Sequence, residues 1–114
     1  MSVYVLYLIK FNADQKTAMM EKPAVRDRAA VHKAAIADFG GRPIVQFGSY
    51  GEWDMVYIYE MPDEKAVAAN LHIADASGLA KASKAIPLMP NEDWVASLEI
   101  ARTTKTAYGS ATDG

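Results

Sequence analysis

The 114 residues of this chain alternate between strand-like and helix-like segments in an order that few folds can accommodate. Four short segments rich in β-branched and aromatic residues are predicted as strands: residues 3–11, 42–50, 53–60 and 81–89. Two segments with apolar residues at helical spacing lie between them: residues 23–39 and 62–77. A third predicted helix is capped by Asn91, directly after Pro90. The predicted order is therefore β-α-β-β-α-β with one additional helix at the end.

The first predicted helix carries a histidine within its apolar stripe. Five positions on one face of that helix form the stripe: Val25, Ala29, His32, Ile36 and Phe39. Pro23 suits the first helical position, and Gly40-Gly41 ends the helix. The polar segment before it, residues 12–22, is predicted as a loop with at most one helical turn. The side chain of His32 is therefore expected to point into the protein.

This order of elements is that of the ferredoxin-like fold, an α+β fold with both main helices on one face of an antiparallel sheet. We expect the first and third strands to lie side by side and parallel in its centre. Hydrophobic residues make up 51% of the chain, enough for one core, so residues 1–104 are predicted to form a single domain. Residues 105–114 are small and polar and are expected to form a flexible tail.

Both faces of the two central strands are apolar. One face of the first strand carries Val3, Val5, Tyr7, Ile9 and Phe11, and the other carries Tyr4, Leu6 and Leu8. The third strand repeats this pattern, with Trp53, Met55, Tyr57 and Tyr59 on one face and Val56 and Ile58 on the other. Because the helices can cover only one face of the sheet, a second subunit is the economical cover for the other face. The sequence therefore predicts a homodimer.

Several short motifs occur in the order and spacing of a known family. They are Asp14-Gln15, Pro23 with Arg26 or Arg28, Gly40-Gly41, and Gly51-Glu52-Trp53-Asp54-Met55-Val56. On these motifs the chain resembles the GYD domain family over roughly residues 3–102, with Trp in the Tyr position of the Gly-x-Tyr-Asp signature. The resemblance implies a dimeric α+β barrel. The wider fold is similar to cofactor-free monooxygenases, haem-degrading enzymes, isomerases, polyketide cyclases and ligand-binding modules, and fold alone does not choose among them.

Composition excludes several classes of function. Twelve basic and 14 acidic residues leave a net charge of −2, so the chain lacks the basic excess that nucleic-acid binding needs. Cysteine is absent, which excludes disulfides, thiolate metal sites and a cysteine nucleophile. The N-terminus resembles neither a signal peptide nor a membrane span, and we expect a cytoplasmic protein with no membrane partner. Two histidines are too few for an all-protein zinc site without carboxylates, and neither a metal nor a cofactor is expected.

Both histidines are candidate catalytic residues. His32 could be a general base in a pocket between helix and sheet, or a core histidine that hydrogen-bonds a backbone carbonyl or a tyrosine hydroxyl. His72 lies late in the second helix, beside the apolar positions of that helix. Relatives of the fold often place a catalytic or metal-binding histidine near this point. Tyr57 is the third catalytic candidate, as a partner in proton transfer.

A cluster of aromatic residues is the candidate binding surface. Tyr7, Trp53, Met55 and Tyr59 share a face with Tyr57 on neighbouring strands, which suits a flat, mostly apolar ligand. An ordinary dimer core is the alternative, because tyrosine is also common at interfaces. Gly51 and Asp54 are expected to be structural, with the Asp54 carboxylate accepting backbone N–H groups at the turn before the third strand.

Two functions remain open. The first is a small cofactor-independent enzyme that acts on an aromatic or polyketide-like compound by histidine and tyrosine acid–base chemistry. The second is a non-catalytic dimeric module that binds a small apolar or aromatic molecule. The enzyme hypothesis requires that His32 and His72 face one cavity. The binding hypothesis predicts that at least one of them is exposed or buried against backbone.

Overall fold

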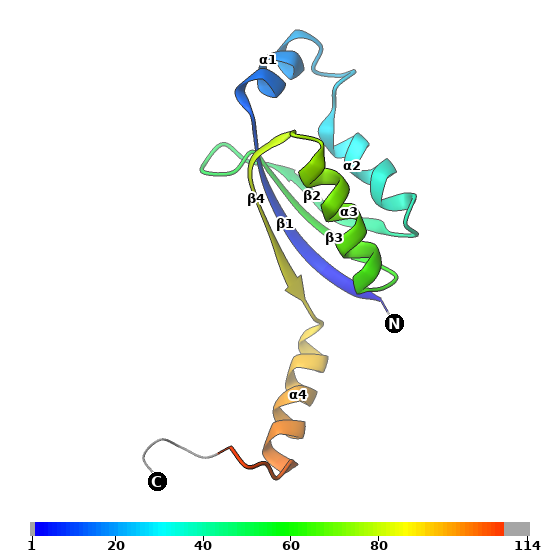
Figure 1. Cartoon of the computed structure of the whole chain (residues 1–114), viewed down its shortest axis with the longest axis vertical. Helices are drawn as coiled ribbons and strands as arrows, with labels where there is room; N and C mark the ends of the chain where they lie inside the picture. The colour runs from blue at the N-terminus through cyan, green and yellow to red at the C-terminus, as the bar shows by residue number, and fades with distance from the viewer. Residues whose placement is uncertain (1, 109–114) are drawn as a thin grey trace.

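The computed structural model describes residues 2–108 and shows a four-stranded antiparallel sheet with four helices (Figure 1). The elements along the chain are β1 (Val3–Phe11), α1 (Ala13–Glu21), α2 (Arg28–Ala37), β2 (Arg42–Gly48), β3 (Met55–Met61), α3 (Glu64–Ala76), β4 (Ala80–Leu88) and α4 (Asn91–Thr103). The strand order across the sheet is β2-β3-β1-β4. This confirms the α+β class and is consistent with the predicted ferredoxin-like arrangement. Of the tail predicted over residues 105–114, residues 109–114 lie outside the described residues.

The two central strands are β1 and β3, and they run antiparallel, with Tyr7 opposite Tyr57. The expectation that they would be parallel was wrong. In this topology each helix connects two strands that point the same way, and a third strand lies between those two. The inserted strand must run in the opposite direction, which makes every neighbouring pair antiparallel.

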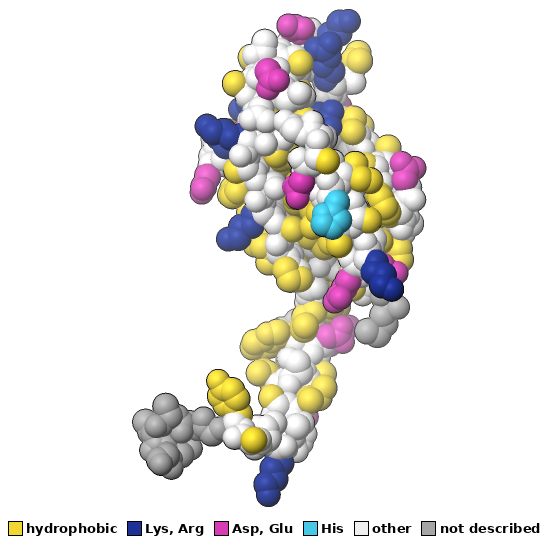
Figure 2. Space-filling model, viewed as in Figure 1, with side chains coloured by type: hydrophobic (Ala, Val, Ile, Leu, Met, Phe, Trp, Pro, Cys, Tyr) yellow, Lys and Arg dark blue, Asp and Glu magenta, His cyan; other side chains and the backbone are white. Residues whose placement is uncertain are grey.

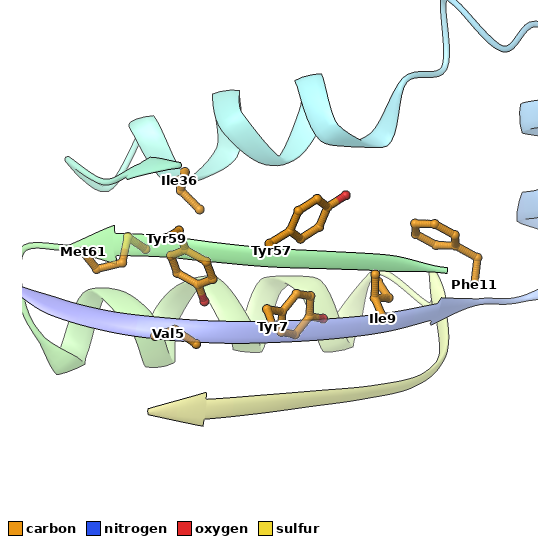
Figure 3. Packing of buried hydrophobic residues seen from close by; sticks show 8 residues of the cluster. All are labelled: Val5, Tyr7, Ile9, Phe11, Ile36, Tyr57, Tyr59 and Met61. Atoms are coloured by element: carbon orange, nitrogen blue, oxygen red, sulfur yellow. The ribbon is translucent and has the colours of Figure 1, made fainter. Parts of the chain in front are cut away.

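The hydrophobic core lies between the helices and one face of the sheet. Its fully buried members are Val5, Tyr7, Ile9, Phe11, Ile36, Tyr57, Tyr59 and Met61. Figure 3 shows seven of these side chains along β1 and β3, with Ile36 reaching towards them from α2. Ala29 of α2 and Val67 and Leu71 of α3 pack against the same cluster. The tyrosine-bearing face of the sheet is therefore the face that the helices cover.

The helices depart from the sequence-based expectation at the N-terminal end. Residues 13–21 form α1, whereas a loop was expected, because the apolar residues of this segment have no helical period. The next helix begins at Arg28 rather than at Pro23. Asp27 is its N-cap and accepts a hydrogen bond from the Ala29 N–H at 3.0 Å. The helix ends at Ala37, two residues before the expected end at residue 39, and Gly40 follows in a turn with a positive φ of 81° that favours glycine.

Asp54 connects three parts of the fold. Its Oδ2 accepts the backbone N–H of Phe11 at 2.9 Å, and its Oδ1 lies 2.9 Å from Nζ of Lys16 in α1. Burial raises the pKa of Asp54, but the hydrogen bonds from Lys16 and Phe11 outweigh burial and leave the pKa below its ordinary value. The carboxylate therefore joins the end of β1 and α1 to the start of β3, and its partners lie outside the turn in which it was expected to accept N–H groups. Gly51 lies in the exposed loop before it.

Helix α4 extends away from the body as an arm (Figure 1). The radius of gyration is 18.4 Å, against about 13 Å for a compact domain of this length. Four large apolar residues of the arm are more than half exposed: Trp94, Val95, Leu98 and Ile100. Figure 2 shows apolar side chains along this arm and at its junction with the body.

The sheet face opposite the helices is also apolar. The side chains of Tyr4, Leu6, Leu8, Val56, Ile58 and Ile86 alternate with the core residues along their strands and stay partly exposed. Phe47 on the edge strand β2 is 66% exposed. We call this surface the outer face. A single subunit thus leaves both the outer face and the α4 arm uncovered.

Candidate functional site

A cavity of about 210 Å³ opens between α2, α3 and the helix-covered face of the sheet. Its floor is formed by Tyr7, Ile9 and Phe11 of β1 and by Tyr57 of β3. Its sides come from the two helices, with Arg28, Val31, His32 and Ala35 on α2, Asn70, Ile73 and Ala74 on α3, and Ser77 directly after α3. The wall is mostly apolar and carries a few polar groups, which is the usual chemistry of a small-molecule site.

His32 lies at the centre of this wall. Its ring stacks on Tyr57 at a centroid distance of 4.0 Å and an interplanar angle of 11°, and it meets Tyr59 edge-on at 5.1 Å. Among the described residues neither Nδ1 nor Nε2 has a hydrogen-bond partner, although both atoms are buried. A core histidine satisfied by a backbone carbonyl or a tyrosine hydroxyl was the alternative reading of this position. That alternative does not hold within the described part of the chain.

The imidazole of His32 is neutral at neutral pH. Burial lowers its pKa from 6.5 to about 4, because the surrounding apolar wall disfavours the charged ring. A neutral imidazole has one N–H donor and one nitrogen acceptor. His32 can therefore donate one hydrogen bond to a molecule in the cavity and accept another from it.

The tyrosines around His32 stay protonated as well. Burial raises the pKa of Tyr57 to about 12 and that of Tyr59 to about 12, and it also raises the pKa of Tyr7. The rings of Tyr7 and Tyr57 lie parallel with centroids 6.5 Å apart. The hydroxyls of Tyr7 and Tyr59 are buried and make no close hydrogen bond among residues 2–108, although Ser83 near Tyr7 and Asn70 near Tyr59 act to lower their pKa values by less than burial raises them. The Tyr7 hydroxyl is thus a further polar group available at the cavity wall.

The structure brings only some of the predicted site residues together. Tyr7, His32 and Tyr57 line the cavity, whereas His72 is exposed on α3 and does not line it. Met55 packs against the core nearby, and Trp53 lies partly buried in the loop that precedes β3. A shared cavity for His32 and His72 is therefore absent from the part of the chain that the structure describes.

Two polar residues of the cavity helices, Arg28 and Asn70, were not predicted as site residues from the sequence. Arg28 lies four positions before His32, which places both on the same face of α2. That spacing could have identified Arg28, but a charged residue at the start of a helix is usually read as exposed. Asn70 is the only buried polar residue among those described, at 8% exposure. It sits on the core face of α3, three and four positions from Val67 and Ala74.

Within residues 2–108, no group of three or more histidine, aspartate or glutamate side chains is arranged to hold a metal ion. The helices of this described part include none that is long and apolar enough to cross a membrane.

Comparison with known proteins identifies one family. No curated protein matches the chain. The model of the GYD domain family matches residues 5–98, which is most of the chain, and it covers α1, α2, α3, strands β2 to β4 and all but the first two residues of β1. The resemblance read from the short motifs is thereby confirmed, and the chain belongs to the GYD domain family.

Proposed function

We propose that this protein is a small-molecule-binding module whose ligand occupies the cavity between α2, α3 and the sheet. The observation that carries the proposal is the set of unpaired buried polar atoms on an otherwise apolar wall. Both nitrogens of His32 and the hydroxyl of Tyr7 have no partner among the described residues. A buried polar group without a hydrogen bond costs about 1–3 kcal/mol, so a ligand that supplies the missing partners recovers that free energy.

The size of the cavity supports a compact ligand. A cavity of ~150 Å³ lined by apolar side chains is large enough for benzene. The cavity here, at about 210 Å³, has room for one ring with a small substituent. Three aromatic side chains line the cavity, Tyr7, His32 and Tyr57, and contact with aromatic rings favours a planar compound.

Binding is better supported than acid–base catalysis. General acid–base catalysis works best when the catalytic pKa lies near the operating pH. The pKa of His32 lies near 4 and that of Tyr57 near 12, so neither group is poised to transfer a proton at neutral pH. The second predicted catalytic residue, His72, is exposed and does not line the cavity. The enzyme hypothesis required that both histidines face one cavity, so an exposed His72 favours the non-catalytic hypothesis.

We also propose that the module is a homodimer. The outer face and the α4 arm are two neighbouring apolar surfaces, and both are exposed on a single subunit. Single soluble domains rarely expose so large an apolar area. A hollow lined by Tyr4, Leu88 and Met89 lies where the outer face meets the start of α4. A second copy would cover both surfaces with matching apolar area.

The binding proposal predicts a localised response to small ring compounds. A panel containing benzyl alcohol, benzamide and benzoate is titrated into ¹⁵N-labelled protein, with backbone amide shifts as the readout. At least one compound should give saturable shifts at the cavity residues of β1, α2 and α3. The same compound should bind His72→Ala with the affinity of the wild type. It should bind His32→Ala at least ~10-fold more weakly, which corresponds to a loss of about 1.4 kcal/mol of binding free energy. Absence of saturable shifts at the cavity across the whole panel would contradict the proposal.

A further inference from the structure

Arg28 places an unpaired positive charge at the cavity. It is the first residue of α2, its side chain is partly buried, and it lines the cavity wall. Its Nε is buried and has no hydrogen-bond partner among residues 2–108. No carboxylate of the described residues lies within ion-pairing distance of its guanidinium. A buried polar atom without a hydrogen bond is costly, so a ligand that reaches the Nε of Arg28 would be stabilised by it.

The acidic side chains nearest to the cavity do not neutralise this charge. Asp27 precedes Arg28 directly, but its carboxylate is held by the Ala29 N–H as the cap of α2. Asp75 on α3 is exposed. Both are close enough to influence the tyrosines of the floor, Asp27 acting on Tyr57 and Asp75 on Tyr7. Neither forms an ion pair with Arg28, so the guanidinium remains available to an incoming anion.

The spacing of Arg28 and His32 on α2 suits a ligand that carries a negative charge at one end. Arg28 and His32 are four residues apart on one helix face, where Cβ atoms lie ~6 Å from each other. A guanidinium presents two parallel N–H groups that match the two oxygens of a carboxylate. A carboxylate at Arg28 would therefore place an attached ring about one helical turn away, beside the stacked rings of His32 and Tyr57.

We infer that the ligand of this cavity is an anion, a single flat ring bearing a carboxylate, with Arg28 as the counter-ion of the carboxylate. This inference rests on the proposed binding function and adds the chemical class of the ligand. The ring lies in the apolar part of the cavity, between the two helices. A second polar substituent on the ring has the His32 nitrogens and the Tyr7 hydroxyl as available partners.

Benzoate and benzamide test the inference, because they share ring and shape and differ in charge. Calorimetric titration of the wild type should show that benzoate binds at least ~10-fold more tightly than benzamide, the preference expected for a charge-assisted bidentate contact. Added salt should reduce the benzoate affinity and leave that of benzamide unchanged. In Arg28→Gln the two affinities should become equal within about twofold. Lys33→Gln, which removes an exposed cation from the same helix, should keep the preference.

Different results would overturn the anion inference and the binding proposal. If benzamide binds the wild type as tightly as benzoate, or if Arg28→Gln keeps the preference for benzoate, the anion inference is overturned and the binding proposal stands. If neither compound, nor any other in the panel, binds at the cavity, both are overturned. Arg28→Lys is a control for a folding defect in Arg28→Gln. Lysine keeps the positive charge but lacks the paired N–H groups of the guanidinium, so this variant should retain part of the preference for benzoate over benzamide.

Discussion

Val56→Asp is expected to convert the protein from a dimer into a monomer. Val56 lies on the outer face, opposite Leu8 of β1 and Phe47 of β2. In the proposed dimer this position is covered by the second subunit, and an aspartate there would bury a charge without a partner. Such a burial costs several kcal/mol, so the dimer dissociation constant should rise by ~100-fold or more. Sedimentation equilibrium at micromolar concentration measures this directly.

A matched variant separates loss of the interface from a general effect of added charge. Ala34→Asp introduces the same side chain at an exposed position of α2, on the other side of the sheet. It should leave the protein dimeric. A wild-type protein that sediments as a folded monomer at micromolar concentration would show that the outer face needs no partner, and the dimer proposal would be wrong.

His32→Phe is expected to stabilise the ligand-free protein and to abolish ligand binding. Phenylalanine keeps the stacking on Tyr57 and removes two buried nitrogens that have no partner among the described residues. At pH 7 the free energy of unfolding should rise by about 1–2 kcal/mol. Ligand affinity should fall, because the new ring has no polar atoms and occupies part of the cavity. Denaturant unfolding, with and without ligand, measures both effects.

The pH dependence of stability gives an independent readout for the same variant. The pKa of His32 is about 4 in the folded protein, below its ordinary value of 6.5, so the unfolded chain binds the proton more readily. The contribution of neutral His32 to the free energy of unfolding of the wild type is therefore fully present above pH 6.5 and is lost progressively as the pH falls towards 4. His32→Phe lacks this loss. The stability gap between the two proteins should widen by about 2 kcal/mol between pH 7 and pH 4.5.

His72→Ala is the control, since it removes the exposed histidine and should change neither the stability at pH 7 nor ligand binding. If His32→Phe instead loses 2 kcal/mol or more at pH 7, its nitrogens must be hydrogen-bonded in the ligand-free protein. His32 would then be a structural histidine, and the main support for the binding proposal would disappear.

The sequence predicted the framework of the fold because the signals for it are local. The apolar alternation of residues 3–11 and 53–60 identified β1 and β3 to within two residues at either end. The period of residues 62–77 identified α3 in the same way. The segment that forms α1 carries no such period, and its helix was missed. The start of α2 was placed at Pro23, whereas the side chain of Asp27 supplies the actual cap.

The site was only partly predictable, because it depends on how two helices rotate over a sheet. The stripe that contains Ile36 required His32 to point inward, and His32 lines the cavity. On α3 the positions that turn inward are Val67, Asn70 and Ala74, so His72 is rotated away from the sheet. Arg28 shares a helix face with His32 by its spacing of four residues, but a charged residue at the start of a helix is usually exposed, so its place at the cavity was recognised only in the structure.

Whether the cavity between α2, α3 and the sheet is a ligand site is tested most directly by a crystal structure of the protein grown with benzoate. We expect density for one ring in the cavity, with its carboxylate paired to the Arg28 guanidinium and the ring beside His32 and Tyr57. A cavity that contains only ordered water bonded to the His32 nitrogens, in crystals grown with benzoate and equally in crystals grown with benzamide or benzyl alcohol, would contradict the account.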